Sequence, residues 1–271
     1  MENGVQFPKY DFRQRLKGML RVDFRRMFKS KLFYILITCS LVIPILMTVM
    51  MTMMDGSVSV NPRTGVETVI QGPENTWQSI GILPTEDGAA MGGMDVMAMC
   101  NINMMFMGVA VFICLFISDD FRSGYAKNLF TVRAKKGDYV LSKTIAGFIC
   151  GIFMLMAYFL GAMLGGGVSG LSFDLCGLTA GNIVMCMIAK ISLMLVFVAI
   201  DVAVSVGAKQ KAWLCLCGSL GAGMLLFMMV GLISPLGSTL MNVALCLAGG
   251  LLFALGLGAV SNTVMKKTSL V

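Results

Sequence analysis

Six long apolar segments dominate this 271-residue sequence and limit what it can fold into. Each is long enough to cross a bilayer core of roughly 30 Å as a helix, which takes about 20 residues. Charged residues make up only 13% of the chain, about half of what a soluble domain carries. The sequence therefore predicts an all-α membrane protein with six transmembrane helices, over residues 33–54, 96–117, 144–168, 182–206, 212–233 and 240–265.

Lys and Arg residues are distributed unevenly between the two sides of these segments. Nineteen lie in residues 1–32, 118–143, 207–211 and 266–271, whereas the opposite side holds only Arg63. Because basic loops stay in the cytoplasm, we expect both termini and the 118–143 loop to be cytoplasmic and the 55–95 loop to lie outside. The net charge of +7 then reflects membrane topology, and no nucleic-acid partner is expected.

The chain has no His, which excludes Ser-His-Asp and Cys-His catalytic sites. Residues 137–144 approach the P-loop pattern, but Ser142 stands where that pattern needs its second Gly to let the backbone wrap a phosphate. We therefore expect neither bond chemistry nor nucleotide binding from this chain.

The first 32 residues form a separate segment with a helical pattern. Apolar residues recur at helical spacing from Phe12 to Phe28, and basic residues such as Arg13 and Arg21 lie between them. This pattern predicts an amphipathic helix at the membrane surface, with its basic face toward anionic lipid. A basic stretch without fixed structure is the alternative.

The loop over residues 118–143 has the most informative order of residues. Asp119 and Asp120 are followed by Gly124, an amphipathic run, a basic cluster and finally Lys143 at the membrane edge. Residues 119–129 predict a short helix parallel to the membrane, by which a soluble partner could act on the second and third spans. An ordinary solvated loop is the alternative from composition alone. The apolar residues expected to contact a partner are Tyr125, Leu129 and Phe130.

This loop resembles the one between the second and third spans of bacterial ABC-2 type permeases, of the peptide or antimicrobial export type. In that family an acidic residue, a Gly, a Lys-Asn-Leu sequence, a basic residue and a final Lys recur at similar spacing. The run from Leu20 to Tyr34 is similar to the family's N-terminal connecting helix. Six spans with cytoplasmic termini match as well, so the resemblance covers essentially the whole chain.

The resemblance implies the membrane subunit of an ATP-driven exporter in the bacterial plasma membrane. The chain itself would bind no cofactor, while ATP and Mg²⁺ would bind to a partner ABC ATPase present in two copies. A second permease would complete the assembly, as a homodimer in preference to a heterodimer. The residues implied in coupling to the ATPase are Asp119, Asp120, Phe121, Arg122, Gly124, Tyr125, Lys127, Leu129 and Arg133.

Polar residues inside the spans indicate where a substrate could pass. Lys190 and Asp201 lie 11 residues apart in the fourth span, and an intramembrane charge usually faces a cavity or a partner. Snorkelling toward an interface is the alternative, and it is favoured for Asp201. The residues expected on a substrate path are Asn101, Asn103, Met104 and Lys190.

Twelve of the 26 Met residues lie between residues 47 and 107, near the expected outer mouth. Plain packing, an adaptable apolar surface for a hydrophobic cargo and a Cu(I) site aided by Cys100 are all open interpretations. The adaptable Met surface, the net-acidic outer loop and the small extracellular domain favour an amphipathic or antimicrobial peptide as cargo. The alternatives are a secondary transporter that needs no ATPase, a Cu(I)-binding membrane protein, and a peptide sensor or immunity protein.

Small residues recur at four-residue spacing in the third span. The pairs are Gly147 and Gly151, Gly161 and Gly165, and Gly166 and Gly170. Such spacing lets helix backbones approach closely, so we expect neighbouring helices to pack tightly against this span.

Overall fold

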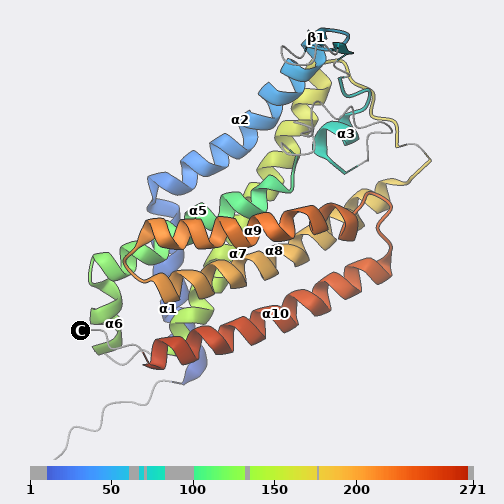
Figure 1. The fold of residues 1–271 in the computed structure, drawn as a ribbon. Helices are drawn as coiled ribbons and strands as arrows, with labels where there is room; N and C mark the ends of the chain where they lie inside the picture. The colour runs from blue at the N-terminus through green and yellow to red at the C-terminus, as the bar shows by residue number, and fades with distance from the viewer. Residues whose placement is uncertain are drawn as a thin grey trace, which may run out of the picture.

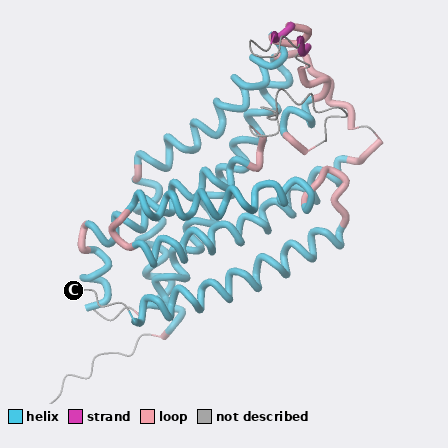
Figure 2. The backbone as a smooth tube through the Cα atoms, viewed as in Figure 1, coloured by secondary structure: helices cyan, strands magenta, loops and turns pink. Residues whose placement is uncertain are grey.

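The computed structural model describes residues 11–60, 67–69, 72–82, 101–131, 135–175 and 177–267, and it is nearly all helical (Figure 2). The strands β1 (Val58–Val60) and β2 (Glu67–Val69) pair antiparallel, with Ser59 opposite Thr68. The helices are α1 (Phe12–Lys29), α2 (Lys31–Met53), α3 (Thr76–Ile80), α5 (Met104–Arg122), α6 (Tyr125–Thr131), α7 (Lys136–Val168), α8 (Ala180–Ala208), α9 (Ala212–Ile233) and α10 (Leu240–Lys267).

Five of the described helices are long and apolar enough to cross a membrane, namely α2, α5, α7, α8 and α10. This confirms a multi-pass, helical membrane protein. The helix α9 coincides with the predicted span 212–233, and among the residues whose side chains are described its continuous apolar stretch is Ala212–Phe227. The sixth crossing therefore stays a prediction.

Two helices extend beyond the predicted spans at the ends that lie near α6. The helix α5 continues through Arg122, and α7 begins at Lys136, two turns before the predicted residue 144. Hydropathy marks only the part of a helix inside the bilayer, whereas backbone hydrogen bonding continues beyond it. At the other end of α5, residues 101–103 form a turn, so Asn101 and Asn103 precede the helix instead of lying within it.

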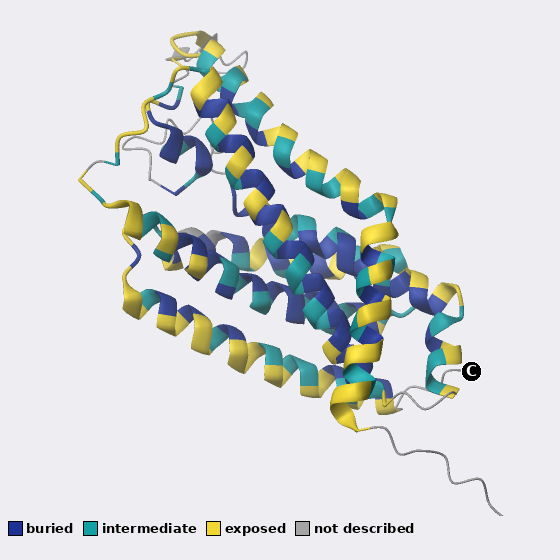
Figure 3. Cartoon of the chain, turned by 180° about the vertical axis from the view of Figure 1, so that it is seen from behind, coloured by how far each residue is buried: buried dark blue, intermediate teal, exposed yellow. Residues whose placement is uncertain are grey.

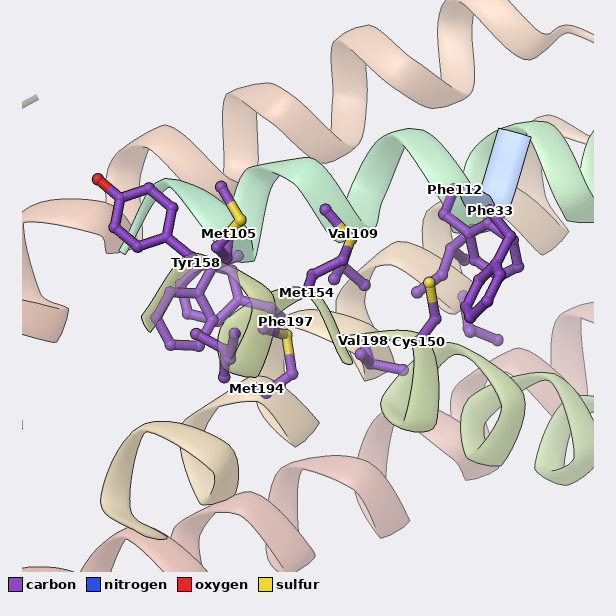
Figure 4. Close-up of a cluster of buried hydrophobic side chains, with 14 of the residues drawn as sticks. Phe33, Met105, Val109, Phe112, Cys150, Met154, Tyr158, Met194, Phe197 and Val198 are labelled. Atoms are coloured by element: carbon purple, nitrogen blue, oxygen red, sulfur yellow. The ribbon is translucent and has the colours of Figure 1, made fainter. Parts of the chain in front are cut away.

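The inner helices are α5, α7 and α8, whereas α2 and α10 leave most of their surface exposed (Figures 1 and 3). The helix α2 packs along α7, α10 packs along α8, and α9 packs against both α5 and α8. Aromatic and sulfur-containing side chains fill the centre (Figure 4). Within it, Phe106 stacks on Phe197 with ring centroids 4.7 Å apart.

The glycines of α7 mostly lie where helices meet, as their spacing predicts. A Cβ on Gly161 would overlap the carbonyl oxygen of Leu41 in α2, and a Cβ on Gly165 would lie 3.0 Å from the Cα of Ile45. Gly170 departs from the prediction because it follows the end of α7, with a φ of 71° and open space around it. The other glycines of this pattern that pack against neighbouring side chains are Gly147, Gly151 and Gly166.

Residues 75–82, which we call the end cap, close the end of the bundle away from α1. The end cap includes α3, and its Trp77 is buried. It is joined to four other segments by the hydrogen bonds between Ser79 and Thr48 (2.5 Å), Thr76 N and Ser172 O (3.0 Å), Ile102 N and Ile80 O (3.0 Å), and Leu236 N and Ile82 O (3.2 Å).

Candidate functional site

A buried cluster of charges joins α1, α5 and α7 at the end of the bundle where α6 lies. The ammonium of Lys143 on α7 is 2.7 Å from Asp23 Oδ1 on α1 and 2.6 Å from Asp120 Oδ2 on α5. These three side chains are at most 3% exposed. A buried ion of this kind is tolerated because its partners are in place, and removing one partner leaves an uncompensated charge.

Two further side chains complete the cluster. The Tyr139 hydroxyl donates to Asp120 Oδ2 over 2.9 Å, and Arg26 Nη1 lies 2.5 Å from Asp120 Oδ1. Two carboxylates are thus balanced by two cations. We call Asp23, Arg26, Asp120, Tyr139 and Lys143 the charge cluster.

Aromatic rings attach α6 to the charge cluster. The guanidinium of Arg26 lies 4.4 Å from the centre of the Tyr125 ring, and Lys143 Nζ lies 4.0 Å from the centre of the Phe116 ring. Burial alone lowers the pKa of Arg26, but the Asp120 carboxylate outweighs it, so the pKa is raised. Burial, and then the two carboxylates, raise the pKa of Tyr125. A charged guanidinium therefore faces a neutral ring at physiological pH, which is the pairing that cation–π attraction requires.

The predicted short helix over residues 119–129 is wrong in its bounds. Residues 119–122 are the last turn of α5, Gly124 turns the chain with a φ of 74°, and α6 begins only at Tyr125. Glycine adopts this conformation at little cost, and it is a common way for a helix to end. The loop therefore contains a separate short helix, but one that is shorter and starts later than expected.

The three apolar residues expected to contact a partner are half-buried and pack against their own bundle. Tyr125 lies under Arg26, the Phe130 ring is 5.5 Å from the Tyr139 ring, and Leu129 packs against the core. The rings and cations of α1 and α7 offer these side chains partners within the chain. The exposed surface of this region is polar, and it includes Arg122, Lys127 and Asn128.

The remaining predicted coupling residues divide between interior and surface. Asp120 and Phe121 are buried, whereas the Asp119 side chain is 68% exposed and lies 3.9 Å from Arg26. Arg133 lies outside the described residues. Asp119, Arg122 and Lys127 are therefore accessible to a partner, whereas Asp120 is enclosed within the charge cluster.

Lys190 forms a second buried polar site, at the opposite end of the bundle beside the end cap. Its side chain is fully buried, and Nζ donates to Asn103 Oδ1 (2.8 Å) and to Ser234 Oγ (3.0 Å). Within the part of the chain that the structure describes, no carboxylate lies within ion-pair distance of Lys190. Two of the three N–H donors of this ammonium are thus used by neutral groups.

The other two residues of the predicted substrate path differ in how close they lie to this site. Asn101 packs against Gly81 of the end cap, and its Oδ1 accepts a hydrogen bond from Asn103 N over 2.9 Å. Met104 is more than a third exposed at the start of α5. The structure therefore brings Asn101, Asn103 and Lys190 together and leaves Met104 at the surface.

Asp201 is buried in α8, so the expected snorkelling toward an interface is wrong. Its side chain is 2% exposed, and Oδ2 has no hydrogen-bond partner among the described residues. The nearby Ser205 hydroxyl donates to the Asp201 backbone carbonyl and contacts the thiol of Cys215 at 2.8 Å. Neighbouring helices cover this acid, which a pattern within one helix does not reveal.

Comparison with known protein families agrees with this architecture. A family model described as an ABC-2 family transporter protein matches residues 19–227, which include every residue of the charge cluster and α6. The chain belongs to the ABC-2 transporter family. No curated protein and no solved structure matches it.

An ABC-2 protein of this kind is the membrane transport component of an ABC transporter and is not itself the catalytic part. Permeases of the family typically work with an ABC ATPase. The recognition of an ABC-2 type permease from the 118–143 loop is thus confirmed at the level of the family.

Sequence reasoning missed Asp23, Arg26 and Tyr139 of this ABC-2 permease. One signal was available, because Asp23 lies four residues from both Met19 and Met27, on the face of α1 that the structure buries. An acid on the apolar face of an otherwise basic helix needs a buried cation. The identity of that cation, Lys143, depends on how α1 docks on α7.

The copper interpretation of the methionines depends largely on Met91, Met94, Met97, Met99 and Cys100, which lie outside the described residues. Of the described methionines, Met53 is 81% exposed and Met105 is buried in the core. Within the described ranges, no three Cys, Asp or Glu side chains are placed to hold a metal ion.

Proposed function

We propose that this ABC-2 permease is the membrane subunit of an ATP-driven exporter that moves an amphipathic peptide or another hydrophobic compound out of a bacterial cell. The observation that carries the proposal is the charge cluster, which ties α6 to α1, α5 and α7. A movement of α6 caused by an ATPase would be transmitted to α1, α5 and α7 through these buried, directional contacts. A solvated loop without such contacts could move without displacing these helices.

The uneven distribution of Lys and Arg supports a cytoplasmic position for α1 and α6. Because basic segments stay inside, the charge cluster would lie at the cytoplasmic ends of the spans, where an ATPase can reach it. The Lys190 site would then lie toward the outside, beneath the end cap, and offer polar groups to a passing cargo. The exposed apolar side of α2, which includes Tyr34, Leu46 and Met53, is available for a second copy of the permease.

Exchange of exposed basic residues around α6 tests the coupling role. In the permease reconstituted with its ATPase, we expect Arg122→Ala combined with Lys127→Ala to reduce ATPase association and transport about tenfold, because each removed side chain is a surface cation that can pair with the ATPase. Co-purification and transport into vesicles measure the two effects. Lys211→Ala, an exposed cation between α8 and α9, is the matched control and should leave both unchanged.

Two results would contradict the proposal. One is unaltered association and transport in the Arg122 and Lys127 double variant, which would remove α6 from coupling. The other is full transport by the permease alone under an ion gradient without any ATPase. That second result would favour the secondary-transporter alternative.

A further inference from the structure

A groove of about 470 Å³ lies between α9 and α10, with α8 as its floor. Figure 1 shows α8 between these two helices. The floor carries Leu193 and Phe197, and the walls carry mainly aliphatic side chains such as Leu226 and Leu245. A volume of this size with an apolar lining is typical of a ligand site.

The groove has the length of one leaflet of a bilayer. Along α10 it extends from Asn242 to Phe253, and 11 residues at 1.5 Å each give about 16 Å. That is close to half of a hydrocarbon core of about 30 Å. Its Phe253 end is apolar, whereas Asn242 provides a side-chain amide at the end nearer to the end cap.

The polar end of the groove adjoins the Lys190 site. Leu193 and Phe197 follow Lys190 by three and seven residues, so all three share one face of α8. Ser234, which accepts a hydrogen bond from Lys190, directly follows Ile233 of the groove wall. A buried ammonium without a carboxylate partner in the described chain therefore stands behind the polar end, where the low dielectric lets its charge act over several ångströms.

We propose that this groove binds an anionic phospholipid of the membrane, with one acyl chain along α8 and the phosphate at the Asn242 end. The apolar walls would accept any acyl chain. The charge of Lys190 selects an acidic headgroup, and the amide of Asn242 can donate to the phosphate. This lipid site shares Lys190 with the proposed cargo path but does not involve the ATPase.

Lipid binding to the purified full-length chain tests the proposal. Native mass spectrometry would compare phosphatidylglycerol with phosphatidylcholine of the same acyl chains. We expect the wild type to bind one phosphatidylglycerol about tenfold more tightly, because only its headgroup carries a net negative charge for Lys190 to attract. Lys190→Met should remove that preference and leave phosphatidylcholine binding unchanged. Asn242→Ala, measured alongside it, should weaken binding of both lipids without changing a buried group, because both lipids carry the phosphate to which the amide donates.

Substitutions at two glycines of α10 test whether the lipid binds in the groove. A Cβ on Gly249, which lines the groove, or on Gly256, which lies outside it, would meet no atom within 4 Å. Gly249→Leu should therefore fill the groove and reduce binding of both lipids at least tenfold, whereas Gly256→Leu should bind as the wild type does.

Four outcomes would overturn the proposal. Equal binding by the two glycine variants would place the lipid elsewhere. A phosphatidylglycerol preference that survives Lys190→Met, or phosphatidylglycerol binding that is unchanged in Asn242→Ala, would remove the headgroup assignment. A change of oligomeric mass in Gly249→Leu, without a change in lipid binding, would mean that a second copy of the chain occupies the groove. None of these outcomes involves the ATPase, so each leaves the proposed export function standing.

Discussion

Replacement of Asp120 by Asn is expected to lower the free energy of unfolding by about 3–5 kcal/mol, which is the usual cost of breaking a buried ion pair on one side. The reason is that the Asp120 carboxylate faces both Lys143 and Arg26, and it accepts the Tyr139 hydroxyl. Without it, Asp23 is the one buried carboxylate of the charge cluster left to balance two cations, one of them fully buried. Chemical denaturation of the purified protein in detergent measures the loss.

Asp119 provides the matched control, because it is the neighbouring acid but is 68% exposed. Asp119→Asn should lower the free energy of unfolding by less than about 0.5 kcal/mol, as expected for an exposed, loosely paired carboxylate. Equal losses for the two variants would show that the charge cluster does not hold the helices together.

The coupling within the cluster can be measured separately with Lys143→Met. The double variant Asp120→Asn with Lys143→Met should lose less stability than the sum of the two single variants, because it removes a carboxylate and a cation together. Additive losses would contradict a direct interaction between these two side chains.

The second large effect is expected at Gly161 in the contact between α2 and α7. Gly161→Ala should lower the free energy of unfolding by about 3 kcal/mol, which is the upper end for overpacked sites. The added Cβ would overlap backbone atoms of Leu41. Backbone atoms cannot move aside as a flexible side chain can. Thermal and chemical unfolding of the purified variant measure the change.

Gly167, six residues later in the same helix, is the control for this substitution. Its Cβ would meet nothing within 4 Å, and Ala favours helix more than Gly does. Gly167→Ala should therefore be neutral or stabilise the protein slightly. If both variants lose stability equally, the loss reflects the glycines themselves and not the contact with α2.

Hydropathy and charge predicted the class of protein because each depends on residues close together in the sequence. The helical pattern from Phe12 to Phe28 likewise predicted α1 within a few residues. The bounds of α6 were partly available as well, since Gly124 after Ser123 is a common signal for the end of a helix. Periodicity along the 118–143 loop obscured that signal, because the last turn of α5 is itself helical.

The charge cluster and the Lys190 site could not be predicted in the same way. Lys143 and Asp23 are 120 residues apart, and Lys190 and Asn103 are 87 residues apart. A hydrophobic pattern shows which face of a helix is buried, but it does not show which other helix covers that face. The end cap poses the same problem, because its residues lie in a polar loop and become buried only through contacts with four other segments.

The end cap has a mechanical consequence for opening that end of the protein. One short piece of chain holds the end of α2, the turn before α5, the loop after α7 and the loop between α9 and α10, each by its own hydrogen bond. A displacement of any one of these helix ends is therefore shared with the other three. Passage through this end requires either that the four ends move as one body or that the cap detaches from all of them.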